Sequence, residues 1–187
     1  NESHAKNIKL AAAKIRGIII KPGEVFSFNQ TAGPYTPENG FALGDSVAGN
    51  SLHQTYGGGV CQVAGTLHNA VLLSGLDILE RHSHTISVPY TPPGQDAAVS
   101  IVGGKDYKFK NNTNNSILIW SSAEQGVLTV AIYGKSKGPF IIIRYRILSV
   151  EPPKEVKQYD QSLPQGIKLD VRQGIPGRTI QYWLEIV

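Results

Sequence analysis

The feature that most constrains the fold of this chain is the run GGGVCQVAGTLHNAVLLSG at residues 57–75. Three consecutive glycines are unfavourable in a helix interior. Helical spacing then follows at five positions: Val63, Leu67, Ala70, Val71 and Ser74. Gly75 suits the position just after a helix end. The run therefore predicts a glycine loop that leads into a helix of about twelve residues, beginning close to Cys61.

After this helix the pattern changes to a period of two, which is typical of a strand. Within residues 78–90, one face carries His82, His84, Ile86, Val88 and Tyr90. The other face carries Arg81, Ser83, Thr85 and Ser87. We therefore expect a strand over 78–90 whose apolar face, with both histidines, is turned towards the helix.

The remaining elements before residue 138 follow the same two periods. An apolar stripe predicts a first helix over Ser3–Arg16, with Ser3 as its N-cap. A segment rich in Gly, Pro, Asn and Thr, residues 30–56, is predicted to be a long loop with one short strand near Phe41. Further strands are expected at 18–20, 24–28, 97–102, 106–110, 116–121 and 127–133, the last two as a hairpin.

The C-terminal segment begins with the strand-like FIIIRYRILSV and continues through EPPKEV into turn-rich sequence. A chain of 187 residues is long enough for one full core and a small appended module. We therefore predict two units, residues 1–137 and residues 138–187, the second small and β-rich. The predicted class is α+β, with the cysteine at the N-terminus of a helix packed on an antiparallel β-sheet.

Composition excludes several classes of function. No stretch of eighteen apolar residues is present, so the sequence predicts no membrane span, and any membrane anchor is expected upstream. The absence of methionine suggests a processed form or a fragment. The net charge of +4 comes from scattered basic residues without a basic block, which favours a solvated surface over nucleic-acid binding. The sequence carries no indication of the oligomeric state.

Cys61 is the single cysteine, so it cannot form an internal disulfide. A lone thiol is either a small buried apolar residue or a reactive group. The anionic thiolate is the nucleophile, and the unsatisfied amides and macrodipole of a helix N-terminus stabilise it. The preceding glycines would let the backbone approach a ligand, and the amides of residues 59–61 could bind an oxyanion. This context raises the reactive interpretation to equal weight with the inert one.

Thiol catalysis also requires a base, and the candidates are His84 and His82 on the predicted strand. A carboxylate must then orient the imidazole, and Asp96 and Asp106 are both candidates. If residues 84–90 paired with 96–102 in a simple hairpin, Asp96 would lie far from His84. The next turn of the chain would then bring Asp106 back towards His84. A zinc site of Cys61 and two histidines is an alternative. Because no paired ligand spacing is present, we predict no metal and no cofactor.

Three segments carry a resemblance to a known family. The run from GGGVCQ to PPGQDAAV, the earlier NIKLAAAKIRGIIIKPGEVFSFN and the later DYKFKNNT resemble the VanW family over about residues 1–135. The tail, through SLP, Gly166, Gly174 and Gly177, resembles more weakly the G-five type of β-module. His68 and His4 depart from the residues expected at their positions, and neither belongs to the proposed chemistry.

The resemblance implies an extracytoplasmic protein of Gram-positive cell envelopes, connected with glycopeptide resistance, in which Cys61 is the nucleophile. The implied activity is that of an L,D-transpeptidase cross-linking peptidoglycan stem peptides through a thioester, or of a carboxypeptidase if water resolves it. His84 is the preferred base and His82 the alternative. We expect substrate contacts at Tyr56, Gly58, Gly59 and Gln62. The competing interpretation is a non-catalytic wall-binding protein in which these residues are structural.

Overall fold

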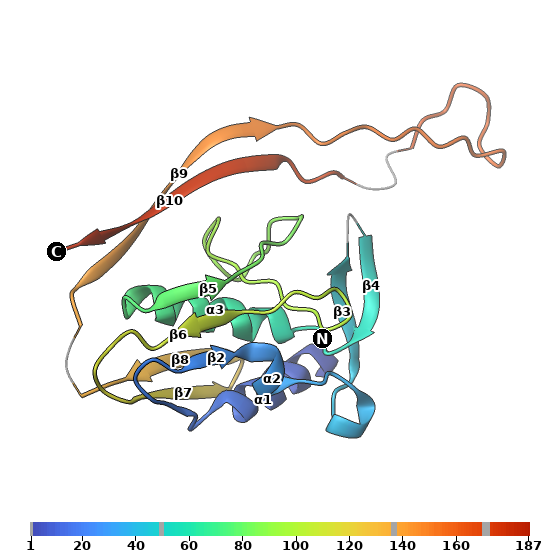
Figure 1. The fold of residues 1–187 in the computed structure, drawn as a ribbon. Coiled ribbons are helices and arrows are strands. Elements are labelled where there is room, and N and C mark those ends of the chain that lie inside the picture. Colours follow the sequence, from blue (N-terminus) through green and yellow to red (C-terminus); the bar gives the residue numbers. More distant parts are fainter. Residues whose placement is uncertain (1, 49–50, 136–137, 170–172) are drawn as a thin grey trace.

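The computed structural model describes residues 2–48, 51–135, 138–169 and 173–187, and Figure 1 shows them as an α+β fold. Helices α1 (Glu2–Ile15), α2 (Phe28–Ala32) and α3 (Val60–Leu73) are accompanied by a short 3-10 turn, η1 (Pro37–Asn39). Small antiparallel sheets surround them. The predicted α+β class is therefore confirmed. No helix in the described part of the chain is long and apolar enough to span a membrane.

Helix α1 begins at Glu2, just before the predicted N-cap Ser3, and buries the face predicted from its apolar stripe. The side chains of Ala11, Ala12 and Ile15 are buried against the core. The helix ends where Gly17 adopts a φ of 82° and donates its N–H to the carbonyl of Ile119 on β7. This bond fixes the end of α1 to the sheet, so the first helix is anchored at the residue where the sequence predicted its stop.

Two three-stranded antiparallel sheets hold the core. One has the order β1 (Ile19–Ile20), β7 (Ile117–Glu124), β8 (Val127–Tyr133), and the predicted hairpin forms its last two strands. The other has the order β2 (Val25–Ser27), β6 (Lys108–Lys110), β5 (Asp77–Glu80). The largest fully buried side chains in the core are Tyr107, Phe28, Phe109, Ile15 and Ile20. The two sheets are thus joined through one hydrophobic core, which also includes α1 and α3.

The predicted long loop at 30–56 is wrong in its second half. Strands β3 (Leu43–Ala48) and β4 (Ser51–Tyr56) form an antiparallel pair in register from Leu43–Tyr56 to Ala48–Ser51. Their sequences, LGDSVA and SLHQTY, lack apolar alternation, and residues 53–56 of β4 are exposed where the pair projects from the body (Figure 1). The segment after β2 is also not a loop, since Ser27 caps the short helix α2 by accepting the N–H of Gln30.

Helix α3 follows the glycine loop. Gly59 is its N-cap with a φ of 106°, Cys61 is its second residue, and Gly75 takes a φ of 65° just after its end. The helix lies across β8 and beside α1, where Val63, Leu67 and Val71 are fully buried. The helical spacing in the sequence thus reflects the face that α3 presents to the core.

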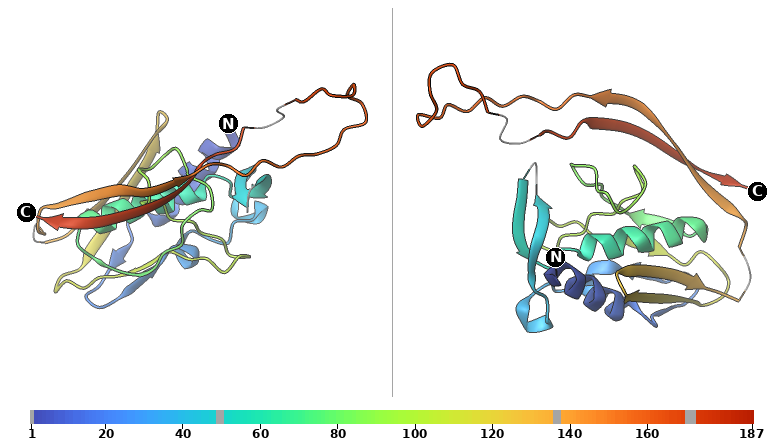
Figure 2. Two further views of the ribbon diagram at one scale, coloured as in Figure 1. Left: turned by 90° about the horizontal axis from the view of Figure 1, so that it is seen from above. Right: turned by 180° about the vertical axis from the view of Figure 1, so that it is seen from behind.

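Strands β9 (Ile141–Glu151) and β10 (Gly177–Ile186) form a long antiparallel ribbon that arches over one side of the body in all views (Figures 1 and 2). The strand-like FIIIRYRILSV thus forms most of β9, and its partner β10 lies in the segment described above as turn-rich. The ribbon packs closely on the body at two glycines, Gly75 and Gly94. A Cβ added to Gly75 would lie 3.2 Å from Ile141 of β9, and one added to Gly94 would lie 3.2 Å from Ile180 of β10. The boundary between residues 137 and 138, next to residues outside the described ranges, stays a prediction.

Candidate active site

The Cys61 side chain is half-buried at the start of α3 and faces the backbone of Val99. The Val99 N–H donates to Sγ across 3.4 Å, and the Cys61 thiol donates to the Val99 carbonyl oxygen across 3.5 Å. An N–H aimed at sulfur stabilises negative charge there. The N–H of Cys61 itself donates to no acceptor among the described residues. The Cys61 sulfur and the unbonded N–H of the same residue thus lie close together. Acyl transfer requires both groups, a nucleophile and a donor to the oxyanion.

The segment between β5 and β6 carries the histidines, and it differs from the predicted strands 78–90, 97–102 and 106–110. Only 77–80 and 108–110 are strands, while 81–99 is held by single contacts such as the bond from Ala98 N–H to the His82 carbonyl. Burial nevertheless alternates from residue 82 to residue 90 with the even positions inward, as the period of two predicted. The inward and outward faces predicted for residues 82–90 are therefore correct, although these residues do not form a strand.

His84 and Asp96 form the tightest polar pair of the site. Asp96 Oδ2 accepts the backbone N–H of His84 at 2.7 Å and lies 2.6 Å from Nδ1 of the same residue. The expectation that a simple hairpin would separate them is wrong. The bond between residues 82 and 98 puts position 84 opposite position 96, a register set by the wide loop 85–95 instead of a tight turn.

The electrostatics join Cys61 to this pair. Burial lowers the pKa of His84, but hydrogen bonds with Asp96 and with the Cys61 sulfur, and the negative charge of both, outweigh it and raise this pKa to about 9. Burial raises the pKa of Asp96, yet the His84 bonds and the Arg81 charge bring it below its usual value. The imidazole is therefore protonated at neutral pH beside the Asp96 carboxylate and the Cys61 sulfur, and the protonated ring is the form that pairs with a thiolate.

His82 and Asp106, the two alternative candidates, make other contacts. His82 Nε2 lies 3.0 Å from Glu80 Oε1, and the His82 side chain is 38% exposed. Asp106 accepts the Ser27 hydroxyl at 2.5 Å and the Asn29 N–H at 2.9 Å, so it holds the start of α2. The structure thus brings Cys61, His84 and Asp96 together and engages His82 and Asp106 elsewhere.

The predicted substrate contacts fall into two groups. A Cβ on Gly58 would lie 2.5 Å from the backbone of Gly44, and one on Gly59 would lie 3.1 Å from the His4 carbonyl oxygen. These glycines are therefore required by close packing of the loop on β3 and α1. Gln62 donates its N–H to the Gly59 carbonyl, and Tyr56, at the end of β4, is 44% exposed. A role for any of the four in binding substrate stays a prediction.

Three residues near the site were not among the predicted site residues. Arg81 binds Asp96, and its assignment to the outer strand face pointed away from that contact. Tyr35 and Tyr90 are half-buried near the cysteine, and burial first, then the Cys61 charge, raises the pKa of both. The Tyr35 hydroxyl donates to Asn29, whereas the Tyr90 hydroxyl is buried without a partner among the described residues. The sequence did indicate Tyr90, because the period of two placed it on the same inward face as His84.

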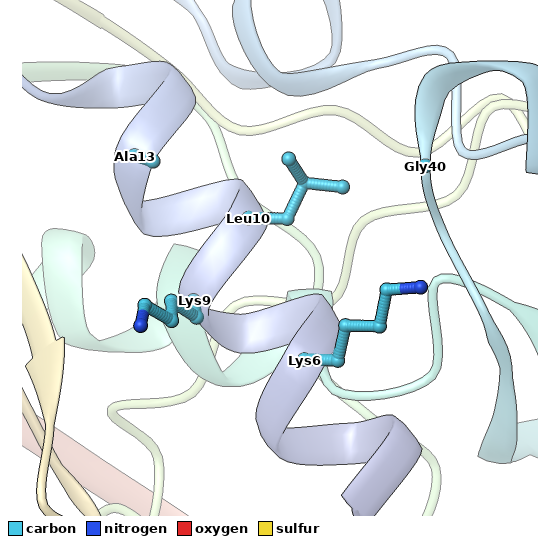
Figure 3. A pocket seen from close by; sticks show the side chains of 5 residues that line it. All are labelled: Lys6, Lys9, Leu10, Ala13 and Gly40. Carbon is cyan, nitrogen blue, oxygen red and sulfur yellow. The ribbon is translucent and has the colours of Figure 1, made fainter.

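A shallow pocket lies on the outer face of α1, lined by Lys6, Lys9, Leu10, Ala13 and Gly40 (Figure 3). Its lining includes none of Cys61, His84 and Asp96, and its two lysines are exposed to solvent. Among the described residues, no group of three or more His, Cys, Asp or Glu side chains is arranged to hold a metal ion. The pocket is thus separate from the thiol and its polar partners.

An α+β domain with a thiol at a helix start beside an imidazole–carboxylate pair defines the class of this protein. The profile of the VanW-like protein family matches residues 3–133, and the chain belongs to that family. It is 41% identical over 159 residues to the uncharacterized protein YoaR of Bacillus subtilis (strain 168), a match covering 83% of this chain and 51% of YoaR.

A second relative is the vancomycin B-type resistance protein VanW of Enterococcus faecalis (strain ATCC 700802 / V583). It is 34% identical over 124 residues, covering 64% of this chain and 45% of VanW. The matches thus span about half the length of these curated relatives. No solved structure matches the chain significantly.

Proposed function

We propose that this chain is a peptidoglycan-modifying cysteine acyltransferase, an L,D-transpeptidase that cross-links stem peptides through a thioester on Cys61. The observation that carries the proposal is that His84 is hydrogen-bonded to both Asp96 and the Cys61 sulfur, contacts that raise the His84 pKa to about 9. Membership of the VanW-like family, and similarity to a protein named for vancomycin resistance, support a role in the cell wall.

In the first half-reaction the Cys61 thiolate attacks the peptide carbonyl after the third residue of a donor stem. The free N–H of Cys61 is the oxyanion donor, and such donors are worth about 3–4 kcal/mol each in comparable sites. Collapse of the tetrahedral intermediate breaks the C–N bond, and the His84 imidazolium gives its proton to the departing amine of the terminal D-amino acid. The product is a thioester on Cys61 and a neutral imidazole.

In the second half-reaction a side-chain amine of a neighbouring stem attacks the thioester carbonyl. Neutral His84 takes the amine proton, a new amide bond forms and the C–S bond breaks, which restores the thiolate–imidazolium pair. Asp96 remains ionised throughout and keeps Nδ1 of His84 bonded, so that Nε2 is available for proton transfer. Attack by water instead of the amine would make the same site a carboxypeptidase.

The proposal places the protein outside the cytoplasm, at the cell wall, with peptidoglycan stem peptides as its partners. A thioester conserves enough of the peptide bond's free energy for exchange without ATP, which suits that compartment. The mildly basic surface, with a net charge of +4, is compatible with an anionic wall.

The test is incubation of the purified chain, and of Cys61→Ala, with disaccharide-tetrapeptide fragments, followed by mass spectrometry. Cross-linked dimers or trimmed peptides from the unaltered chain, and none from Cys61→Ala, are the expected result. Absence of product from both proteins, together with binding to whole sacculi, would overturn the proposal in favour of a non-catalytic wall-binding protein.

A further inference from the structure

Arg81, the first residue after β5, makes three hydrogen bonds around Asp96. Its Nη2 donates to Asp96 Oδ1 at 2.9 Å, its Nε donates to the Asp96 carbonyl at 2.7 Å, and Nη2 also donates to the Gly94 carbonyl at 2.9 Å. The Arg81 side chain is only 19% exposed and that of Asp96 only 11%. A charged pair this sheltered from water has a much better defined geometry than a surface ion pair.

The two oxygens of the Asp96 carboxylate therefore have separate partners. Oδ1 faces Arg81, while Oδ2 faces the backbone N–H and Nδ1 of His84. Because Arg81 binds the side chain and the main-chain carbonyl of the same residue, it restricts rotation of Asp96 about its Cα–Cβ bond. The planar guanidinium can make these contacts at once, whereas the single ammonium of a lysine cannot reproduce them.

The turn that supplies these carbonyls is also held from its other side. Gly94 has a φ of 80°, and the space where a Cβ would be is bordered by Ile180 at 3.2 Å and Tyr182 at 3.6 Å, both on β10. Figure 1 shows the loops of this segment rising between α3 and the ribbon. Arg81 thus binds a turn that the ribbon already supports, which gives the guanidinium a rigid set of acceptors.

We infer that Arg81 is a positioning residue of the Cys61 site, which holds the Asp96 carboxylate in the orientation that binds His84. The inference rests on the proposed function and adds a residue to it. Arg81 touches neither the thiol nor the imidazole, so it acts through Asp96. Without it, Asp96 can rotate, His84 loses its anionic partner for part of the time, and the thiolate–imidazolium pair becomes less stable.

The experiment measures the rate of iodoacetamide alkylation of Cys61 against pH in the unaltered chain and in Arg81→Gln. We expect the acid limb of the profile to move to higher pH by about one unit, because loss of a charge-assisted hydrogen bond to the imidazolium typically has that effect. Arg81→Lys keeps the charge without the fork, and we expect a smaller shift in the same direction. Thermal unfolding of each variant shows that it is folded.

The matched control is Arg144→Gln, which removes an arginine from the exposed pair with Glu185 on the ribbon. Its profile is expected to overlay that of the unaltered chain. A folded Arg81→Gln or Arg81→Lys with an unshifted profile overturns the inference. A shift to lower pH also overturns it, since Arg81 would then act only as a charge competing with the imidazolium. If Cys61 of the unaltered chain reacts as slowly as an ordinary thiol below about pH 7, the proposed function itself fails, which is a separate outcome.

Discussion

Oδ2 of Asp96 accepts the backbone N–H of His84 at 2.7 Å while lying 2.6 Å from the ring Nδ1 of the same histidine. One carboxylate oxygen therefore fixes both the main chain and the ring of the proposed base. Since Nδ1 is bonded to Asp96, Nε2 is the ring nitrogen left for the proton transfer proposed at Cys61. For this reason, a conservative replacement of Asp96 should lower activity while leaving the protein folded.

We predict that Asp96→Asn lowers the rate of acyl transfer by about 10²–10⁴-fold, the range found for groups that orient or assist a catalytic base. The amide is nearly isosteric, but it cannot stabilise a protonated imidazole, so the pKa of His84 should fall from about 9. Steady-state turnover of stem-peptide fragments and an NMR titration of His84 measure the two effects. Unchanged turnover in a folded variant would argue against the assigned role.

The two histidines of the sequence RHSH should respond differently to replacement. We predict that His84→Ala abolishes acyl transfer, whereas His82→Ala retains at least about a third of the activity, because His82 is paired with the surface residue Glu80. The measurement is product formation with the same stem-peptide fragments. Equal losses in both variants would show that the separation of their roles is wrong.

Helices α1 and α3 and the hairpin of β7 and β8 could be predicted because each has one buried face, which imposes its period on the sequence. The choice of Cys61 likewise depended on local features, a glycine loop followed by helical spacing. The preference for His84 depended on the family resemblance, since the residues alone left His82 equally open. Chemistry located at the start of a regular element can thus be predicted from local sequence.

The partners of His84 could not be predicted in the same way. Their contact depends on the register between residues 82 and 98, which follows from the wide loop 85–95 and not from a tight turn of known geometry. The β3–β4 pair was missed because its two sequences have no apolar alternation, which is the pattern that predicts a strand. Arg81 was placed on the outer face because strand geometry was assumed to continue past residue 80, where the ladder ends.

The raised pKa of His84 predicts a dependence of stability on pH. Its folded value of about 9 exceeds the ordinary value of 6.5, so the protonated ring stabilises the fold fully below pH 6.5, and this contribution is lost as the pH rises through 9. We expect the difference in melting temperature between the unaltered chain and His84→Gln to shrink over that interval. A difference that stays constant between these pH values would contradict the assignment.

Asn7 joins α1 to the two segments that lead towards the cysteine. Its side chain has no solvent exposure, donates to the carbonyls of Ala42 and Gly58 at 2.9 Å each, and accepts the Ala42 N–H at 2.8 Å. Asn7→Ala leaves these backbone groups without partners, and we predict a loss of about 2–3 kcal/mol of unfolding free energy. Urea denaturation measures it. Asn112→Ala, which removes an exposed amide, is the control and should change stability by under about 0.5 kcal/mol.

Two glycines on either side of Cys61 should tolerate a methyl group very differently. A Cβ on Gly58 would lie 2.5–2.7 Å from backbone atoms of Gly44 and Asp45, whereas one on Gly65 would meet its nearest neighbour, the Ala97 nitrogen, at 3.4 Å. Since backbone cannot yield as a side-chain end can, we predict that Gly58→Ala destabilises the fold by about 2 kcal/mol or more, as overpacking does. Gly65→Ala replaces a glycine inside α3 and should be neutral or stabilising by up to about 1 kcal/mol. Thermal unfolding of both variants under one condition gives the comparison. If Gly58→Ala has the same melting temperature as the unaltered chain, the glycine loop does not pack closely on β3. Close packing would then not explain why glycine occupies position 58.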